Sequence, residues 1–168
     1  DRLRREAQAL ARLVDPHVVR VYDVGEADGR VFVAMELVEG MNLRQWLASA
    51  RSVPERVAVL RAAGRGLVAA HQAGLIHRDF KPDNVLIADD GRVLVTDFGL
   101  ARSADPPPSQ DGPAPGTAAP SSEVLTATGA LVGTPAYMAP EQIDGQPAPA
   151  SDQYAFAVTA WEALFGQR

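Results

Sequence analysis

Polar residues at two places in the chain have the types and the spacing needed for phosphoryl transfer. Asp79, Lys81 and Asn84 lie in one polar loop that runs directly into an apolar stretch, and Asp97 follows a second apolar stretch. Carboxylate and amide oxygens are suitable ligands for Mg²⁺. Phosphoryl transfer depends mostly on positioning and on the neutralisation of charge, which a carboxylate, two metal ligands and a lysine can supply.

A hairpin is expected to bring these residues together. The apolar stretches at 85–87 and 93–95 are separated by Asp-Asp-Gly at 89–91, and an Asp-Gly step between two apolar runs is a hairpin signal. Pairing of the two strands places Asn84 and Asp97 at the same end of the hairpin, beside the polar loop. The sequence therefore predicts a cluster of oxygen ligands for magnesium, with one carboxylate left over.

The motifs around these residues resemble the catalytic core of the protein-kinase superfamily. In chain order they are His-Arg-Asp-Phe-Lys-Pro-Asp-Asn at 77–84, Asp-Phe-Gly at 97–99 and Ala-Pro-Glu at 139–141. Within that superfamily, the chain is most similar to the eukaryotic-like Ser/Thr protein kinases of bacteria. The resemblance is specific because all of these motifs occur in order, at compatible spacing, over nearly the whole chain.

The resemblance implies a role for each polar residue of the loop. Asp79 accepts or orients the proton of the attacking hydroxyl. Asn84 and Asp97 hold magnesium against the phosphates of ATP, and Lys81 neutralises the γ-phosphate during transfer. Taken singly, each residue could be an ordinary turn or cap residue, since Asp and Asn are common in turns. Taken together, at this spacing, they favour catalysis.

Two earlier segments resemble the parts of a kinase that meet the nucleotide. Glu6 resembles the helix-C glutamate that pairs with a lysine of the N-lobe; a surface glutamate paired with a nearby arginine is the alternative. Residues 35–40 resemble the hinge between the lobes, with a methionine gatekeeper and backbone groups that face the adenine edge; a strand end before a glycine turn is the alternative. The expected nucleotide contacts are Glu6, Met35, Glu36, Val38, Lys81, Leu86 and Asp97.

Residues 103–130 differ in composition from the rest of the chain. Six of these 28 residues are proline, and Ser, Ala, Gly and Thr supply most of the others. Such a stretch cannot bury enough apolar area to offset the entropy of ordering it, so we predict that it is disordered. It lies where a kinase has its activation segment, and it makes that segment longer than is usual in the family.

The resemblance also implies regulation through this segment. Arg78, directly before the catalytic aspartate, marks kinases that are commonly switched by phosphorylation of the activation loop, where a phosphate is held by charge-assisted hydrogen bonds. Thr126 and Thr128 are the expected acceptors, although they could be ordinary solvated hydroxyls. Thr134 is expected to hydrogen-bond toward Asp79 and Lys81 and to help place the substrate hydroxyl.

The expected fold class is α+β, a two-lobed protein-kinase-like fold. Residues 1–168 are read as a partial kinase domain: a remnant of the N-lobe at 1–35 with helix C and strands 4 and 5, the hinge at 36–40, and a mostly helical, C-terminally truncated C-lobe at 41–168 that contains the insert at about 103–130.

Local signals predict the elements that position the site. Asn42 and Ser52 are expected to cap helices, the second of them with Glu55 in a capping box. Asp152 is expected to receive hydrogen bonds from the catalytic-loop backbone as a scaffold residue. His71 is expected to pack or to end its helix. The remaining predictions are a helix at 1–14, strands at 18–22 and 30–35, a fully buried helix at 154–165, and a stack of Leu10, Val21, His77 and Phe98.

Composition narrows the partners and the location. The net charge of −5 argues against nucleic acid or an anionic membrane as the main partner, and the absence of cysteine excludes disulfides and thiolate metal sites. No apolar run is long enough to span a bilayer. A cytoplasmic location is expected, although a parent chain could carry a membrane anchor elsewhere. The sequence sets no expectation for the oligomeric state.

The function expected from the resemblance is that of a Ser/Thr protein kinase, which uses ATP and Mg²⁺ to phosphorylate Ser or Thr of a protein substrate. Lys81 supports this class, since tyrosine kinases lack a lysine at that position. The segment alone is expected to be inactive, because no Gly-rich loop or partner lysine for Glu6 occurs in it. A pseudokinase that acts as a regulatory binding module, or a degenerate gene fragment, are the alternatives.

Overall fold

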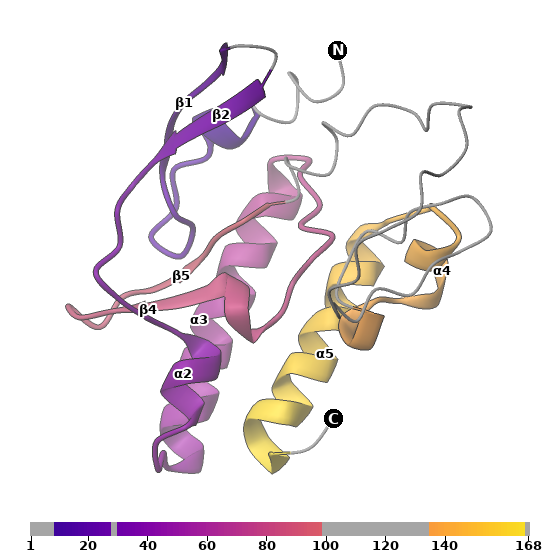
Figure 1. The fold of residues 1–168 in the computed structure, drawn as a ribbon. Helices are drawn as coiled ribbons and strands as arrows, with labels where there is room; N and C mark the ends of the chain where they lie inside the picture. Colours follow the sequence, from indigo (N-terminus) through magenta and orange to yellow (C-terminus); the bar gives the residue numbers. More distant parts are fainter. Residues whose placement is uncertain (1–8, 28–29, 99–134, 167–168) are drawn as a thin grey trace, which may run out of the picture.

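The structure, a computed structural model, describes residues 9–27, 30–98 and 135–166 (Figure 1). Residues 9–12 form a helical turn that leads into an antiparallel pair, β1 (Val21–Ala27) and β2 (Arg30–Met35). The predicted strand at 18–22 was wrong in its bounds, since β1 begins later and runs further. Val18 and Val19 lie outside the pair, because the residues on either side of Val18 bond to Val95: Val19 donates to the Val95 carbonyl, and the Val95 amide donates to the His17 carbonyl.

A second sheet carries the predicted hairpin. Its antiparallel order is β3 (Gly40–Asn42), β4 (Val85–Ala88) and β5 (Val93–Val95). The turn closes through a bond from the Ala88 amide to the Arg92 carbonyl. Gly91 takes a φ of +86° there, a conformation that favours glycine. The Asp-Gly signal therefore predicted this hairpin correctly.

Besides the helical turn at 9–12, the described part of the chain has the α-helices α2 (Leu43–Leu47), α3 (Val53–Gln72), α4 (Pro140–Ile143) and α5 (Pro149–Phe165), of which α2 and α3 pack against the second sheet. Short 3-10 turns, η1 (Pro82–Asn84) and η3 (Pro135–Tyr137), lie at the two segments that carry polar motifs. The predicted caps are confirmed: Asn42 and Ser52 each form a capping box, with Gln45 and with Glu55.

Helix α5 differs from its prediction in two respects. It begins at Pro149 rather than at residue 154, because proline suits the first turn and Ser151 Oγ accepts a bond from the amide of Ala148. It is also not fully buried, since Trp161 and Phe165 are 54% and 61% exposed. Their rings contact each other, with centroids 4.4 Å apart, and no other described segment covers that side.

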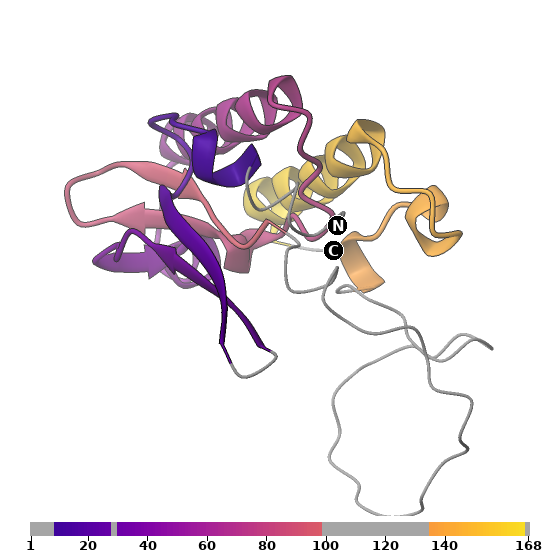
Figure 2. The same cartoon turned by 90° about the horizontal axis from the view of Figure 1, so that it is seen from above.

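The elements form one core that supports the polar loop. Figures 1 and 2 show α3 and α5 side by side, with the β4–β5 hairpin against α3 and the β1–β2 pair at the far end from α2. Phe80, Val85 and Val95 are almost completely buried in the main apolar cluster. Phe80 within the loop that bears the candidate catalytic residues, and Val85 directly after it, thus anchor that loop to the core.

Gly66 allows α3 to approach the segment before β1 closely. A Cβ on Gly66 would lie 2.4 Å from the carbonyl oxygen of His17 and 2.9 Å from Val95 Cγ2. We therefore expect Gly66→Ala to destabilise the protein by about 1–3 kcal/mol, despite the better helix propensity of alanine. Urea unfolding measures this. Gly64→Ala is the matched control, because its Cβ would meet only the Phe156 ring at ordinary contact distance; equal stability of the two variants would contradict the prediction.

Candidate active site

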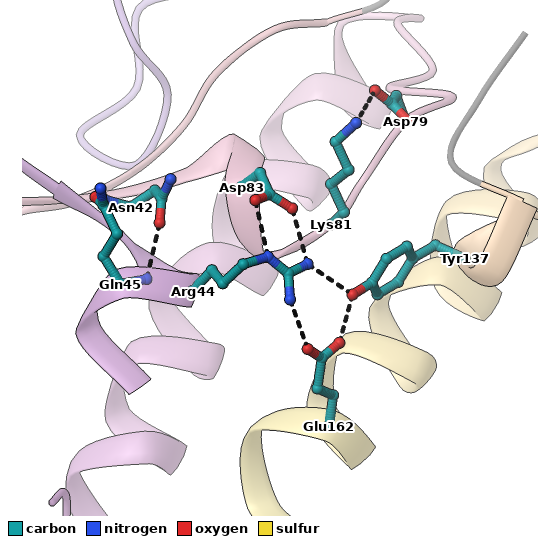
Figure 3. A network of polar contacts seen from close by, with 8 residues as sticks. All are labelled: Asn42, Arg44, Gln45, Asp79, Lys81, Asp83, Tyr137 and Glu162. Carbon is teal, nitrogen blue, oxygen red and sulfur yellow. Dashed lines mark hydrogen bonds and ion pairs between the residues drawn. The ribbon is translucent and has the colours of Figure 1, made fainter. Parts of the chain in front are cut away.

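The structure brings the polar residues of the loop into direct contact. Lys81 Nζ lies 2.9 Å from Asp79 Oδ2 (Figure 3). Asn84 Nδ2 donates to the backbone carbonyl of Asp79 at 2.8 Å and, at 3.3 Å, to the same carboxylate oxygen. Turn η1 makes this possible, since it folds the chain back between Lys81 and Asn84. The Lys81 ammonium and the Asn84 amide both contact the Asp79 carboxylate and hold it in one orientation.

The hairpin register brings the second motif to this site. Val85 pairs with Val95, and the amide of Thr96 donates to the Asn84 carbonyl at 3.0 Å. Asp97 therefore directly follows the end of the β4–β5 pair at which Asn84 lies, as the sequence predicts. Asp97 is exposed and has a left-handed φ of 57°. A non-glycine residue held in this region stores strain of about 1–3 kcal/mol, which is common at functional sites.

The donor set around Asn84 and Asp97 fits magnesium. Because Asn84 Nδ2 is directed at Asp79, its amide oxygen is the atom left for a metal. Within residues 9–27, 30–98 and 135–166, no group of three or more His, Cys, Asp or Glu residues could hold a metal alone. Mg²⁺ usually binds one or two carboxylates together with substrate phosphates, so a site made by Asn84 and Asp97 would be completed by the nucleotide.

Asp152 holds the backbone of the polar loop at 77–84 by two hydrogen bonds. Its carboxylate, only 1% exposed, accepts hydrogen bonds from the amides of His77 and Arg78, each at 2.8 Å. Arg78 has a φ of 66°, so these bonds fix a strained residue directly before Asp79. The predicted scaffold role of Asp152 is confirmed. His71 has a partner that the sequence did not reveal, since its Nε2 lies 2.7 Å from Asp152 Oδ2.

His77 joins the two motifs through its ring. Burial lowers the pKa of His77, so the imidazole is neutral. Its Nδ1 then accepts from the amide of Asp79 at 3.3 Å, and its Nε2 donates to the carbonyl of Thr96 at 2.9 Å. The ring also packs on Phe98, with centroids 4.7 Å apart. Leu10, Val21 and Phe98 belong to one buried cluster, while the predicted stack of these residues with His77 is shown only for the contact of His77 with Phe98.

Glu36 and Val38, which follow β2, have backbone groups that lie beside a buried apolar cluster. The amide of Glu36 donates to the Arg20 carbonyl, and its carboxylate binds Arg92 at 2.8 Å. Among the described residues, no hydrogen bond involves the Glu36 carbonyl or the backbone of Val38. Val38 and Leu86 pack together against Val19, Ala88 and Leu94, while Met35 is 41% exposed. The Glu36 carbonyl and the Val38 backbone groups, beside this buried cluster, are thus available to a ligand.

Comparison with known proteins decides the family. Residues 1–168 match the protein kinase domain. The chain belongs to the protein kinase family. It is 45% identical over 168 residues to serine/threonine-protein kinase PknL of Mycobacterium tuberculosis, which covers 98% of this chain and 38% of PknL. It is 43% identical over 170 residues to the probable serine/threonine-protein kinase pknA2 of Bifidobacterium longum, with 99% of this chain and 20% of that protein covered.

A solved kinase structure confirms the fold class. The kinase domain of Mycobacterium tuberculosis PknI superposes with a TM-score of 0.73 at 33% identity, over 98% of this chain and 56% of that one. The α+β kinase-like fold predicted from the motifs is therefore correct. This kinase chain spans only 20–38% of the length of the two curated relatives named above. In its described part, no helix is long and apolar enough to cross a membrane.

Several predicted kinase residues lie outside the described residues. They are Glu6, the activation-segment insert at 103–130 with Thr126 and Thr128, and Thr134. The Ala-Pro-Glu motif is described and is tied to α5, since Ser151 Oγ donates to Glu141 at 2.7 Å. This hydrogen bond is the main cause of a lowered pKa of Glu141, whose carboxylate is therefore ionised.

Sequence reasoning missed Arg44 altogether. This residue of α2 contacts Asp83 in the kinase catalytic loop, Tyr137 in η3 and Glu162 in α5. The local pattern gave no signal for it, because a basic residue on a short helix is most often a solvated side chain. The sequence offered one signal: two acidic residues, Asp83 and Glu162, lie in segments that are expected to pack in the same lobe as Arg44.

Proposed function

We propose that this chain is the catalytic part of a Ser/Thr protein kinase, which transfers the γ-phosphoryl group of ATP to Ser or Thr hydroxyls of proteins. The observation that carries this is the contact of Asp79 with both Lys81 and Asn84, at the end of the hairpin that also bears Asp97, in a chain of the protein kinase family. A carboxylate, a lysine and two candidate metal ligands are the groups of the catalytic side that phosphoryl transfer uses for positioning and charge neutralisation.

The residues divide the work by their chemistry. Asp79 takes the proton of the attacking hydroxyl, or orients that hydroxyl toward the phosphorus, as a positioned carboxylate can. Lys81, 2.9 Å from the Asp79 carboxylate, places a positive charge where the γ-phosphate oxygens gain negative charge. Magnesium, when bound, neutralises the phosphates of ATP, and Asn84 and Asp97 are the residues that would hold it.

The nucleotide base and the regulatory phosphate have proposed partners too. The backbone of Glu36 and Val38 would receive the adenine edge, with Met35 and Leu86 at the apolar side of the ring and Glu6 as the partner of a nucleotide-binding lysine. A phosphate on Thr126 or Thr128 would be held by Arg78, and Thr134 would help place the acceptor hydroxyl. The names of the bacterial relatives support Ser and Thr as the acceptors, since both are serine/threonine-protein kinases.

Phosphate transfer can be tested by intact mass. The protein, expressed at the full length that its gene encodes, is incubated with ATP and Mg²⁺, with and without a chelator and beside an Asp79→Asn variant. We expect mass gains in units of one phosphoryl group in the metal-containing sample alone, with phosphoserine or phosphothreonine after hydrolysis. Folded protein that gains no mass and phosphorylates no added protein would overturn the proposal and favour a binding module.

A further inference from the structure

Arg44 lies at the centre of a polar network that joins four elements of the fold. Its guanidinium grips Asp83 of η1 with two parallel bonds, Nε to Oδ1 and Nη2 to Oδ2, both 2.8 Å long. Nη2 also donates to the Tyr137 hydroxyl of η3 at 2.9 Å, and Nη1 donates to Glu162 Oε1 of α5 at 2.8 Å. Figure 3 shows the side chains converging from four separate ribbons.

The network is closed and internally complementary. Tyr137 donates its hydroxyl hydrogen to Glu162 and accepts from Arg44, so the carboxylate, the phenol and the guanidinium form a ring of hydrogen bonds. Burial, reinforced by the bond to Glu162, raises the pKa of Tyr137 and keeps the phenol neutral. The bond from Arg44 lowers the pKa of Asp83, which therefore stays ionised. The phenol of Tyr137 and the carboxylate of Asp83 are therefore in the states that these bonds require.

The chemistry of the network demands arginine in particular. Arginine presents several donors in a rigid planar fork, which can grip one carboxylate bidentately and still reach other acceptors. Lysine has a compact charge and cannot span the same three partners. The exposed fractions of the Arg44 and Glu162 side chains are 35% and 16%, so solvent screens the network only in part.

The position of Asp83 connects this network to the catalytic groups. Asp83 lies in η1 between Lys81 and Asn84, the two residues that contact the Asp79 carboxylate. The two bonds from Arg44 to Asp83 therefore hold the η1 turn, which sets the distance between Lys81 and Asn84. Through Tyr137 the same guanidinium fixes this turn relative to η3, directly before the Ala-Pro-Glu motif.

We propose that Arg44 is a positioning residue for phosphoryl transfer. It holds the η1 turn of the catalytic loop, with Lys81 and Asn84, in register with η3 and α5. The proposal rests on the proposed kinase function, and it adds to that function a residue outside all the catalytic motifs. Arg44 itself touches neither Asp79 nor Lys81 in the structure; it acts through Asp83.

The test compares Arg44→Met with Arg44→Lys in the protein at its full encoded length. The readouts are the autophosphorylation rate at saturating Mg-ATP and the ATP concentration that gives half of that rate. Because small displacements of reacting groups are costly, we expect Arg44→Met to lower the maximal rate by about 10- to 100-fold, with the half-saturating ATP concentration changed by less than about twofold. Arg44→Lys keeps the charge but not the fork, so it should stay at least about fivefold below the parent.

Arg56→Met is the matched control for a purely structural effect. Arg56 of α3 also bonds to α5, through the carbonyls of Ala163 and Leu164, but it contacts no residue of the catalytic loop. Its loss should lower the melting temperature while the maximal rate stays within about twofold of the parent, because it removes an interaction that catalysis does not use. A maximal rate of Arg44→Met within twofold of the parent, or no lower than that of Arg56→Met, overturns the proposal.

Hydrogen exchange separates failure of this proposal from failure of the kinase function. Amide exchange over residues 79–85 is measured in the parent, Arg44→Met and Arg56→Met without nucleotide. We expect faster exchange at these amides in Arg44→Met alone, since removal of the grip on Asp83 releases the η1 turn. If the parent transfers no phosphate, this comparison still decides whether Arg44 orders the loop. Unchanged exchange in Arg44→Met counts against the positioning role even in an active enzyme.

Discussion

Replacing Asp79 with asparagine is expected to lower the rate of phosphate transfer by about 10²- to 10⁴-fold, the range that a positioned acid or base contributes. The variant keeps the size of the side chain, so the contact to Asn84 and the fold of the loop are retained. It loses the negative charge that binds Lys81 at 2.9 Å and that, in the proposed mechanism, accepts the hydroxyl proton. Steady-state rates at saturating Mg-ATP, together with ATP binding by calorimetry, measure this effect.

Asp89→Asn is the control for Asp79→Asn. It makes the same change of charge at an exposed aspartate in the turn between β4 and β5, away from the polar contacts of the loop. We expect its rate to stay within about twofold of the parent. Binding of ATP should be similar in all three proteins. An Asp79→Asn protein that retains more than a tenth of the parent rate would show that this carboxylate is not the catalytic one.

Replacing Asp152 with alanine is expected to destabilise the protein by about 2–6 kcal/mol, because two backbone amides lose their acceptor at about 1–3 kcal/mol each. Its carboxylate is 1% exposed and accepts bonds from two backbone amides, those of His77 and Arg78. Alanine leaves both amides without their acceptor, and His71 loses its partner as well. Urea denaturation followed by circular dichroism measures the loss of stability.

The phosphate-transfer rate of Asp152→Ala should fall as well, because the backbone directly before Asp79 is no longer held. Arg78 has a left-handed φ of 66°, and its backbone loses a restraint when Asp152 is removed. Asp152→Asn should be less destabilising than alanine, because its amide oxygen can still accept one bond. Asp144→Ala, at the exposed C-cap of α4, is the matched control and should change stability by less than about 0.5 kcal/mol. A loss of under about 1 kcal/mol in Asp152→Ala would mean that water replaces the carboxylate.

The sequence by itself determined the features that depend on neighbours a few residues apart. The caps at Asn42 and Ser52 close onto residues three positions away. The β4–β5 hairpin follows from an Asp-Gly turn between two apolar runs, and its register brings Asn84 near Asp97. The ordered motifs also identified the family, because they specify residue types at fixed spacing, which does not depend on how the distant segments pack.

The tertiary structure alone decided the features that depend on distant segments. Arg44 is 39 residues from Asp83, 93 from Tyr137 and 118 from Glu162, so no local pattern could associate them. Val18 and Val19 have the apolar, branched side chains typical of a strand, but they lie outside β1 and are joined to Val95 of β5 instead. The spacing of apolar residues predicts which face of an element can be buried, whereas the actual burial of a side chain depends on which segment packs against it. For this reason Leu43 is buried and Trp161 is exposed.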